Sequence, residues 1–140
     1  MEDCKLVSTP MITSEKISEE DDSNKVDTSL YITLIGNLLY LTATRPDILY
    51  ALSVLSRFMH SPSLKHYATA KRVLRYIKGT VALRVKYSKS AEKKLELLGY
   101  FDSDWGGSVE DSRSTSGYIF SLGFGNFTWS SKKQETRSNL

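Results

Sequence analysis

Basic side chains crowd the middle of the chain, where they suit contacts to a phosphate backbone. Nine lysines and arginines and no acidic residue lie between Arg57 and Lys89. Aromatic residues are interleaved with them, and a basic stretch of this kind attracts nucleic acid through its phosphates. The alternative is a solvated helix face, since helices turn their charges outward. The predicted contacts to an RNA or DNA duplex are Arg57, Lys65, Lys71, Arg72, Arg75, Lys78, Arg84 and Lys86.

The rest of the composition excludes several classes of protein. The 140 residues carry a net charge of +3, with 40% hydrophobic and 25% charged residues, as in ordinary globular proteins. Cys4 is the single cysteine and makes no internal disulfide. No run approaches the roughly 18 apolar residues of a membrane span. The first residues lack the basic start and apolar run of a signal peptide. We therefore expect a soluble, intracellular protein with no membrane partner.

Three apolar stripes at helical spacing predict a small helical subdomain over residues 28–79. It follows residues 1–27, an acidic segment that we expect to be a mobile leader with no packed core of its own. Pro46 separates the first two helices, Ser61 or Ser63 caps the third, and Gly79 ends it. The stripes consist of Leu30, Leu34, Leu38 and Leu41, then Ile48, Leu52, Leu55 and Met59, then Leu64, Tyr67, Ala70, Leu74 and Ile77.

After residue 79 the apolar period changes from helical to the two-residue rhythm of a strand. The predicted strands cover residues 83–87, 95–102, 114–122 and 127–130, with a loop at Gly106 and Gly107 and a turn at 123–126. Residues 80–140 therefore form a β region, and the fold class is α+β.

Several motifs in sequence order resemble the Pol polyproteins of copia-type LTR retrotransposons. LLYLT at 38–42, TRPDILYA at 44–51 and KRVLRYIKGT at 71–80 resemble the segment that follows the polymerase core. GYFDSDWGG at 99–107, SRSTSGY at 112–118 and WSSKKQ at 129–134 resemble the first strands of the family's ribonuclease H domain. The resemblance implies a three-helix subdomain followed by an incomplete ribonuclease H-like antiparallel β-sheet.

The same resemblance makes Asp102 the first metal-binding carboxylate of a two-magnesium hydrolase. Asp104, two residues on, has the strand parity to point the same way, but the favoured interpretation is a loop aspartate before Trp105. We expect the family's other carboxylates to lie beyond this sequence, so Asp102 is predicted to be the remnant of an incomplete metal site. The prediction is a non-enzyme with no cofactor and no small-molecule substrate. The apolar residues that covering helices would bury are expected to face water in part, namely Tyr118, Phe120, Leu122, Phe127 and Trp129.

A second resemblance concerns Arg72, Val73, Leu74 and Arg75, an Arg-x-Leu-Arg tetrapeptide similar to the host-targeting motif of RxLR effectors from oomycete plant pathogens. The first functional hypothesis is a non-catalytic Pol-derived protein acting as a secreted effector. It would enter plant host cells, bind a host protein and suppress defence or cell death. The alternative is an inert or nucleic-acid-binding relic of the polyprotein. Residual ribonuclease H activity is a third hypothesis.

Overall fold

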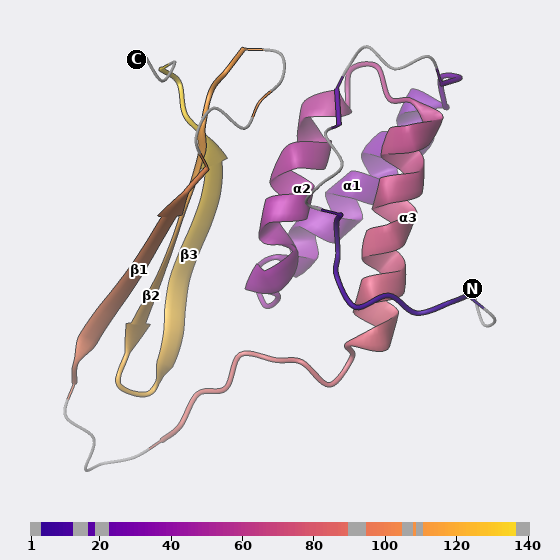
Figure 1. The fold of residues 1–140 in the computed structure, drawn as a ribbon. Helices are drawn as coiled ribbons and strands as arrows, with labels where there is room; N and C mark the ends of the chain where they lie inside the picture. The colour runs from indigo at the N-terminus through magenta and orange to yellow at the C-terminus, as the bar shows by residue number, and fades with distance from the viewer. Residues whose placement is uncertain are drawn as a thin grey trace. The chain divides into compact units, whose positions relative to one another are not determined.

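The computed structural model describes residues 4–12, 17–18, 23–89, 95–104, 108 and 111–136. The chain forms two compact units, Met1–Leu83 and Arg84–Leu140. The first holds three α-helices and the second a three-stranded antiparallel sheet (Figure 1). The α+β class is confirmed. In the described part of the chain, no helix has the length and apolar character needed to cross a membrane.

The helices of the first unit lie where the apolar stripes predict them. They are α1 (Thr28–Leu41), α2 (Leu49–Leu55) and α3 (Leu64–Gly79). The 3₁₀ turns η1 (Pro46–Ile48) and η2 (Ser56–Phe58) flank α2. Helix α1 begins after Asp27, whose carboxylate accepts the Leu30 N–H at 2.9 Å. Pro46 occupies the first turn of η1, where the missing N–H costs nothing.

Ser63, rather than Ser61, caps α3. Its hydroxyl accepts the His66 N–H at 3.3 Å, and His66 Nδ1 accepts the Ser63 N–H at 3.1 Å. Because Nδ1 is an acceptor, the neutral imidazole carries its proton on Nε2, which lies 3.0 Å from the Ser18 carbonyl oxygen and donates to it. The ring is fully buried and stacks on Phe58 at 4.0 Å. His66 therefore ties the cap of α3 to the segment that precedes α1.

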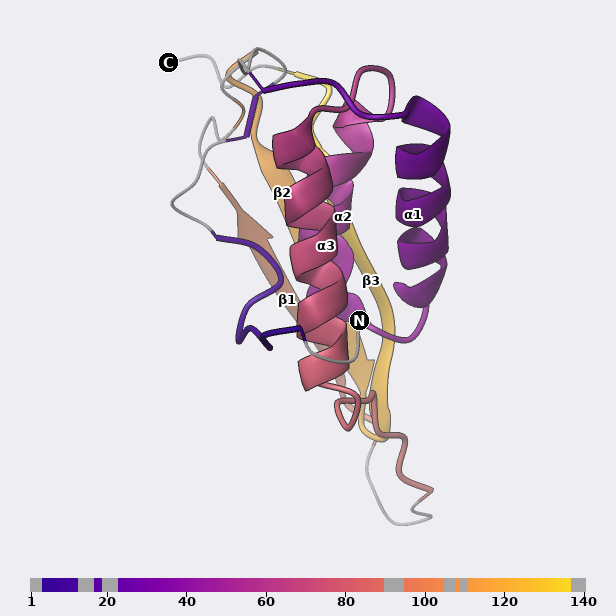
Figure 2. The same cartoon turned by 90° about the vertical axis from the view of Figure 1, so that its right-hand side faces the viewer.

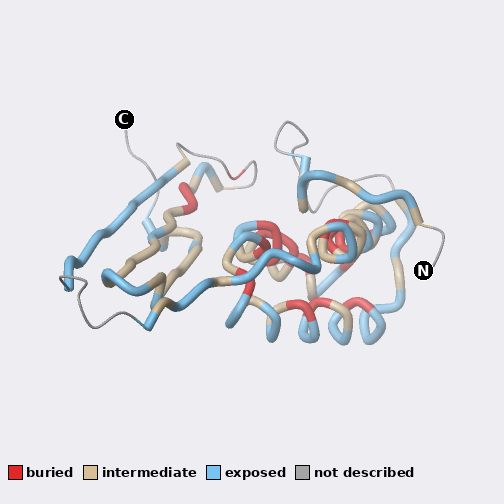
Figure 3. The backbone as a smooth tube through the Cα atoms, turned by 90° about the horizontal axis from the view of Figure 1, so that it is seen from below, coloured by how far each residue is buried: buried red, intermediate tan, exposed pale blue. Residues whose placement is uncertain are grey.

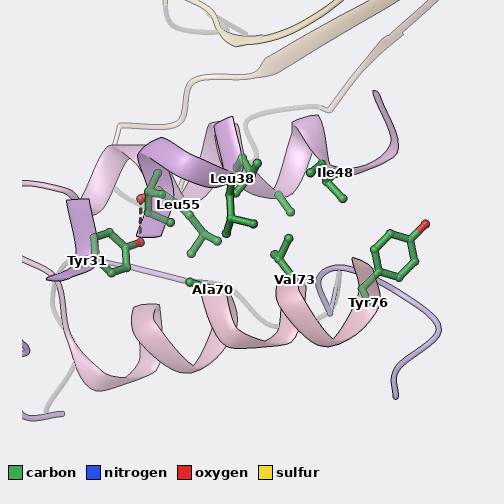
Figure 4. Close-up of a cluster of buried hydrophobic side chains, with 10 residues drawn as sticks. Tyr31, Leu38, Ile48, Leu55, Ala70, Val73 and Tyr76 are labelled. Carbon is green, nitrogen blue, oxygen red and sulfur yellow. Dashed lines mark hydrogen bonds between the residues drawn. The ribbon is translucent and has the colours of Figure 1, made fainter. Parts of the chain in front are cut away.

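The helices share one apolar core (Figure 4). It consists of Tyr31, Ile35, Leu38, Ile48, Ala51, Leu52, Leu55, Ala70, Val73 and Tyr76. The Tyr31 hydroxyl donates to the Leu55 carbonyl at 2.9 Å, so the one polar atom of that buried ring has a partner. Figure 3 shows the buried positions concentrated in these helices. Removal of this apolar surface from water is the main source of the unit's stability.

The described residues of the acidic segment 1–27 belong to the helical unit. Val7, Met11 and Val26 pack against the helical core. Backbone hydrogen bonds from Val26 N–H to Pro62 O (3.1 Å) and from Leu64 N–H to Asn24 O (2.8 Å) hold the end of the segment beside the cap of α3. These apolar side chains thus pack on a core formed by other elements, and the mobility of the leader stays a prediction.

The second unit is a sheet of order β1-β2-β3, made of β1 (Leu97–Ser103), β2 (Thr115–Leu122) and β3 (Gly125–Lys133). The register places Asp102 opposite Gly117 and Ile119 opposite Trp129, with a bulge between Phe120 and Ser121. The strands predicted at 95–102, 114–122 and 127–130 are confirmed, although β3 is longer at both ends. The predicted loop at Gly106 and Gly107 lies outside the described residues.

The strand predicted at 83–87 is wrong. Residues 83–87 pair with no strand of the sheet, and Leu83 and Tyr87 are exposed. An alternating pattern specifies a strand only where one face is buried, and here no apolar position is fully buried. The next residue, Ser88, donates its N–H to the Phe124 carbonyl at 2.9 Å. The segment therefore passes the β2–β3 turn without extending the sheet.

The apolar side chains of the sheet face water in part, as the sequence predicts. Tyr118 is 39% exposed and Phe127 48% exposed. Phe120, Leu122 and Trp129 are half-buried, and all of β1 is exposed. Every buried apolar residue in the described part of the chain belongs to the helical unit. Phe120 instead contacts the rings of Phe101 and Tyr118, at centroid distances of 5.3 and 5.4 Å.

Candidate nucleic-acid interface

Lys71, Arg75 and Lys78 form a basic ladder on α3. Their spacing of four and then three residues places them on one side of the helix. The opposite side carries His66, Ala70 and Val73 into the core. Lys71 and Lys78 are exposed, and Arg75 is half-buried. Because α3 contains no acidic residue, no carboxylate on the helix neutralises this side.

Tyr67 contributes an aromatic surface beside the basic ladder. The Lys71 Nζ atom lies 4.4 Å from the centroid of the Tyr67 ring, which is cation–π distance. The sequence alternates aromatic and basic residues in this region, and at Tyr67 and Lys71 the two kinds of side chain are in direct contact. Tyr76, by contrast, is buried in the core, so it contributes to stability and not to a surface.

The other predicted basic residues do not join the ladder. Arg72 is half-buried and donates to Thr9, from Nε to the carbonyl oxygen at 3.2 Å and from Nη2 to the hydroxyl at 3.0 Å. Arg57 lies in η2 and Lys65 in the first turn of α3, both half-buried. Arg84 and Lys86 belong to the second unit. The predicted contact set is therefore divided among several environments.

The Arg-x-Leu-Arg tetrapeptide lies within α3. Val73 is fully buried in the helical core. Leu74 is half-buried and packs against this core. Arg72 is held by Thr9, whereas Arg75 belongs to the basic ladder. The two arginines thus have different surroundings, although their i, i+3 spacing allows them to share a side.

Arg45 builds a polar cluster that the sequence analysis missed. Arg45 is 9% exposed, and its guanidinium donates to both carboxylate oxygens of Asp47, at 2.9 and 2.8 Å. It also donates to the Thr80 carbonyl at 3.2 Å and the Thr80 hydroxyl at 2.7 Å. The Tyr76 hydroxyl donates to Asp47 Oδ2 at 2.8 Å. We call these four residues the Arg45 clamp.

The Arg45 clamp joins the start of η1 to the end of α3. The hydrogen bonds from Arg45 hold the pKa of Asp47 below its ordinary value, although partial burial opposes the shift. The same contact raises the pKa of Arg45. The available signal was the motif TRPD together with Tyr76 and Thr80. The sequence, however, indicated only a helix break at Arg45-Pro46, a place for Asp47 at a helix start and a family resemblance, and it predicted no contact to Tyr76 or Thr80. Within the clamp, Arg45 and Asp47 of the motif have a structural role, because they bind Thr80 and Tyr76.

The sheet does not gather carboxylates into a metal site. Asp102 lies exposed in β1 opposite Gly117, which has no side chain to act as a ligand. Asp104 follows β1, accepts the Thr115 N–H, and donates its own N–H to the Thr115 carbonyl at 3.1 Å. Among the residues that the structure describes, no group of three or more His, Cys, Asp and Glu side chains is placed to hold a metal ion. The described donors therefore do not fit a pair of magnesium ions.

Asp111 is the third aspartate described in the second unit, and its carboxylate is bound by basic residues. Lys133 Nζ lies 2.9 Å and Arg113 Nε 3.4 Å from Oδ2. Hydrogen bonding to Lys133 holds the pKa of Asp111 far below its ordinary value. This carboxylate links the loop before β2 to the end of β3.

Comparison with known proteins identifies the family. The chain is 43% identical over 131 residues to the retrovirus-related Pol polyprotein from transposon RE2 of Arabidopsis thaliana, which covers 94% of this chain and 9% of that polyprotein. It is 40% identical over 139 residues to an uncharacterized mitochondrial protein of Arabidopsis thaliana, covering 99% of this chain and 56% of that protein. It is also 44% identical over 107 residues to secreted RxLR effector protein 161 of Plasmopara viticola, covering 76% and 74% of the two chains.

The chain therefore belongs to the family of retrovirus-related Pol polyproteins from copia-type transposons, and it is a retroelement-derived protein. It spans 9% of the length of the matched polyprotein. No family model and no solved structure matches it.

Proposed function

We propose that this chain is a non-catalytic, Pol-derived protein that contacts an RNA or DNA duplex through the basic ladder of α3. The observation that carries the proposal is the alignment of Lys71, Arg75 and Lys78 on one side of a helix whose other side is fixed in the core. Seven residues of helix span about 10 Å, which suits a short run of phosphates along one strand. The contact is blind to base sequence.

The rigidity of α3 supports this proposal. The capping box of Ser63 and His66 fixes the start of the helix, and the Arg45 clamp holds its end. Helix side chains projecting from a fixed backbone lose less conformational freedom when they bind than side chains on a mobile segment. The basic ladder is therefore preorganised.

The absence of catalysis is part of the proposal, as is a ribonuclease H-like origin of the sheet. Support comes from the surroundings of the carboxylates, because Asp104 bonds to the backbone of Thr115 and Asp111 is paired with Lys133. Asp102 would then act alone, and two-metal hydrolysis needs several oxygen ligands. With Mg²⁺ and a labelled RNA–DNA hybrid, we expect no cleavage. Cleavage that disappears in Asp102→Asn would contradict this part.

Binding is tested with two variants of equal charge change. In the ladder variant, Lys71, Arg75 and Lys78 are each replaced by Gln. In the control variant, the exposed residues Lys25, Lys89 and Lys132, which are not among the predicted contacts, are replaced by Gln. We expect the ladder variant to bind a labelled hybrid at least about tenfold more weakly than the wild type at low salt, and the control variant to stay close to wild type. Equal losses in the two variants would mean that net charge, not α3, governs binding.

A second candidate function is that of a secreted effector in plant host cells. The observation that favours it is the 44% identity to secreted RxLR effector protein 161, of which this chain covers 74%. Because Val73 is buried, recognition of the tetrapeptide would use Arg72 and Arg75 on the folded helix. A tagged copy expressed in leaf cells should then suppress induced cell death and bind a host protein, and Arg72→Ala/Arg75→Ala should lose both effects. Unchanged cell death with the wild-type protein would remove this candidate.

A further inference from the structure

Helices α1 and α3 line a groove with a volume of about 640 Å³, to which α2 contributes no residue. Figure 2 shows the two helices from the side. Leu30 and Leu34 line the groove from α1, and Tyr67 and Leu74 line it from α3. The lining residues run from Leu30 to Asn37 on α1 and from Tyr67 to Arg75 on α3, about two turns of each helix, so the groove follows the helix axes.

The groove is apolar, and part of it is open to water. Leu30 is 52% exposed, and Leu34 and Leu74 are half-buried. Leucines that keep part of their surface in water are stabilised when a partner covers that surface. Helix α1 also carries apolar residues on more than its core-facing side, a pattern typical of a helix that is covered on a second side.

Charge along the α3 wall is of one sign. Lys71 and Arg75 line the groove, and none of its lining residues is acidic. The Lys71 ammonium lies over the Tyr67 ring, so a cation and an aromatic face are presented together. A ligand that fills the groove must bring apolar groups along its length and negative charge toward α3.

We propose that this groove binds an acidic amphipathic helix of a partner protein. Apolar side chains of that helix at i, i+3, i+4 and i+7 would pack on Leu30, Leu34 and Leu74. Carboxylates on its flank would pair with Lys71 and Arg75. The site goes beyond duplex binding, because the leucines of α1 have no part in contacts to phosphate, although it shares two cations with the basic ladder.

A labelled model peptide tests the proposal with the full chain. The probe is a helical peptide with leucines at i, i+3, i+4 and i+7 and glutamates on one flank. The control peptide carries lysine in place of each glutamate. We expect the acidic peptide to bind at least about tenfold more tightly than the basic one in fluorescence anisotropy. Equal affinities, or no saturable binding up to about 1 mM protein, would overturn the proposal.

Matched substitutions on α1 locate the binding site. Leu30→Gln should weaken binding of the acidic peptide at least about tenfold. Ile32→Gln, at a 45% exposed position of the same helix that does not line the groove, should leave it unchanged. Equal effects of the two substitutions would contradict the site. Leu30→Gln should leave duplex binding unchanged. The groove proposal and the duplex-binding proposal can therefore be refuted separately.

Charge reversal gives a readout that a loss of folding cannot imitate. In Lys71→Glu/Arg75→Glu, the acidic peptide should bind more weakly and the basic peptide more tightly than in the wild type. Weakening of both peptides would argue against charge pairing at α3. A concentration-dependent dimer that Leu30→Gln dissociates would assign the groove to a second copy of the chain and overturn the proposal.

Discussion

Arg45 is the residue in which sequence motif and stability are most closely linked. Arg45 is largely removed from water, and its guanidinium donates hydrogen bonds both to Asp47 and to Thr80. When one partner of such a cluster is removed, the other polar groups stay partly buried without a hydrogen-bond partner. The resulting loss of folding stability is larger than the net stability that the pair contributes. In this chain, the motif TRPD therefore joins η1 to the end of α3.

Asp47→Asn tests the Arg45 clamp through pH. We expect a loss of about 1.5–3 kcal/mol in the free energy of unfolding near neutral pH. The folded state depresses the pKa of Asp47, so this contribution is present above the ordinary value of 3.8 and is lost as the pH falls through the lower folded value. Urea unfolding followed by far-UV circular dichroism should therefore show a smaller decline of stability with acid in Asp47→Asn than in the wild type.

The control for that experiment is Asp102→Asn, since Asp102 is exposed in the other unit. This substitution should leave the unfolding of the helices unchanged at every pH. The clamp would be excluded as a source of stability if Asp47→Asn and Asp102→Asn gave the same pH profile.

Ser63→Ala tests the cap of α3. Loss of the hydroxyl removes the acceptor for the His66 N–H, and we expect a cost of about 1 kcal/mol. Ser61→Ala is the matched control, because Ser61 is exposed and its N–H donates to Phe58, a bond that the substitution keeps. It should stay within about 0.5 kcal/mol of the wild type. Equal losses in urea unfolding would show that Ser63 is not the cap.

At the scale of elements, the sequence predicted the helices well because each has a stripe of apolar residues and a clear end. The strands 115–122 and 125–133 were also predictable from β-branched and aromatic residues around a glycine turn. The failure at 83–87 has the opposite cause. Periodicity reports which residues alternate, but it contains no information on whether a second surface exists to bury them.

The candidate site was predictable in composition but not in grouping. A run of basic residues identifies α3 as cationic, and helical spacing selects Lys71, Arg75 and Lys78 as neighbours. The engagement of Arg72 by Thr9 depends on a contact across 63 positions of the chain, which no local pattern encodes. The Arg45 clamp was missed for the same reason, since Arg45 and Thr80 are 35 positions apart.

Gly99→Ala tests the aromatic side of the sheet. A Cβ atom at Gly99 would lie 2.6 Å from Cε1 of Phe120, whose ring also contacts Phe101 and Tyr118. Displacement of the ring should cost about 1–2 kcal/mol. Tryptophan fluorescence reports the loss, and the smaller side chain in Gly99→Ala/Phe120→Leu should reduce it.

Gly36→Ala provides the control for a glycine substitution with free space. No atom lies within 4 Å of a Cβ at this position of α1, so alanine should stabilise the helical unit by about 0.5–1 kcal/mol through its helix propensity. Stabilisation at both positions would contradict the close approach of Phe120 to Gly99.

At the scale of the whole molecule, the two units differ in what holds them together. The helical unit has a contiguous buried core. In the described part of the sheet unit, Ser108, Ser114 and Thr115 are buried, but no apolar residue is. Hydrophobic burial is the dominant favourable term in folding, so we expect the sheet unit to be the less stable of the two.

Two spectroscopic probes separate the units. Both tryptophans fall in the sequence range of the second unit, Arg84–Leu140, and Trp129 lies in β3, whereas the α-helices belong to the first unit. The loss of native tryptophan fluorescence should occur at lower urea than the loss of helical circular dichroism. Coincident transitions would show that the units unfold as one cooperative structure.

The salt dependence of duplex binding is the most direct test of the central claim, that the basic ladder of α3 contacts phosphates. The logarithm of the binding constant falls linearly with the logarithm of salt concentration, by about 0.9 for each phosphate contact. We predict that the ladder variant lowers this slope by about 2–3, whereas the control variant changes it by less than about 1. A ladder variant with the wild-type slope, or a control variant that lowers the slope as much, would contradict the proposed interface.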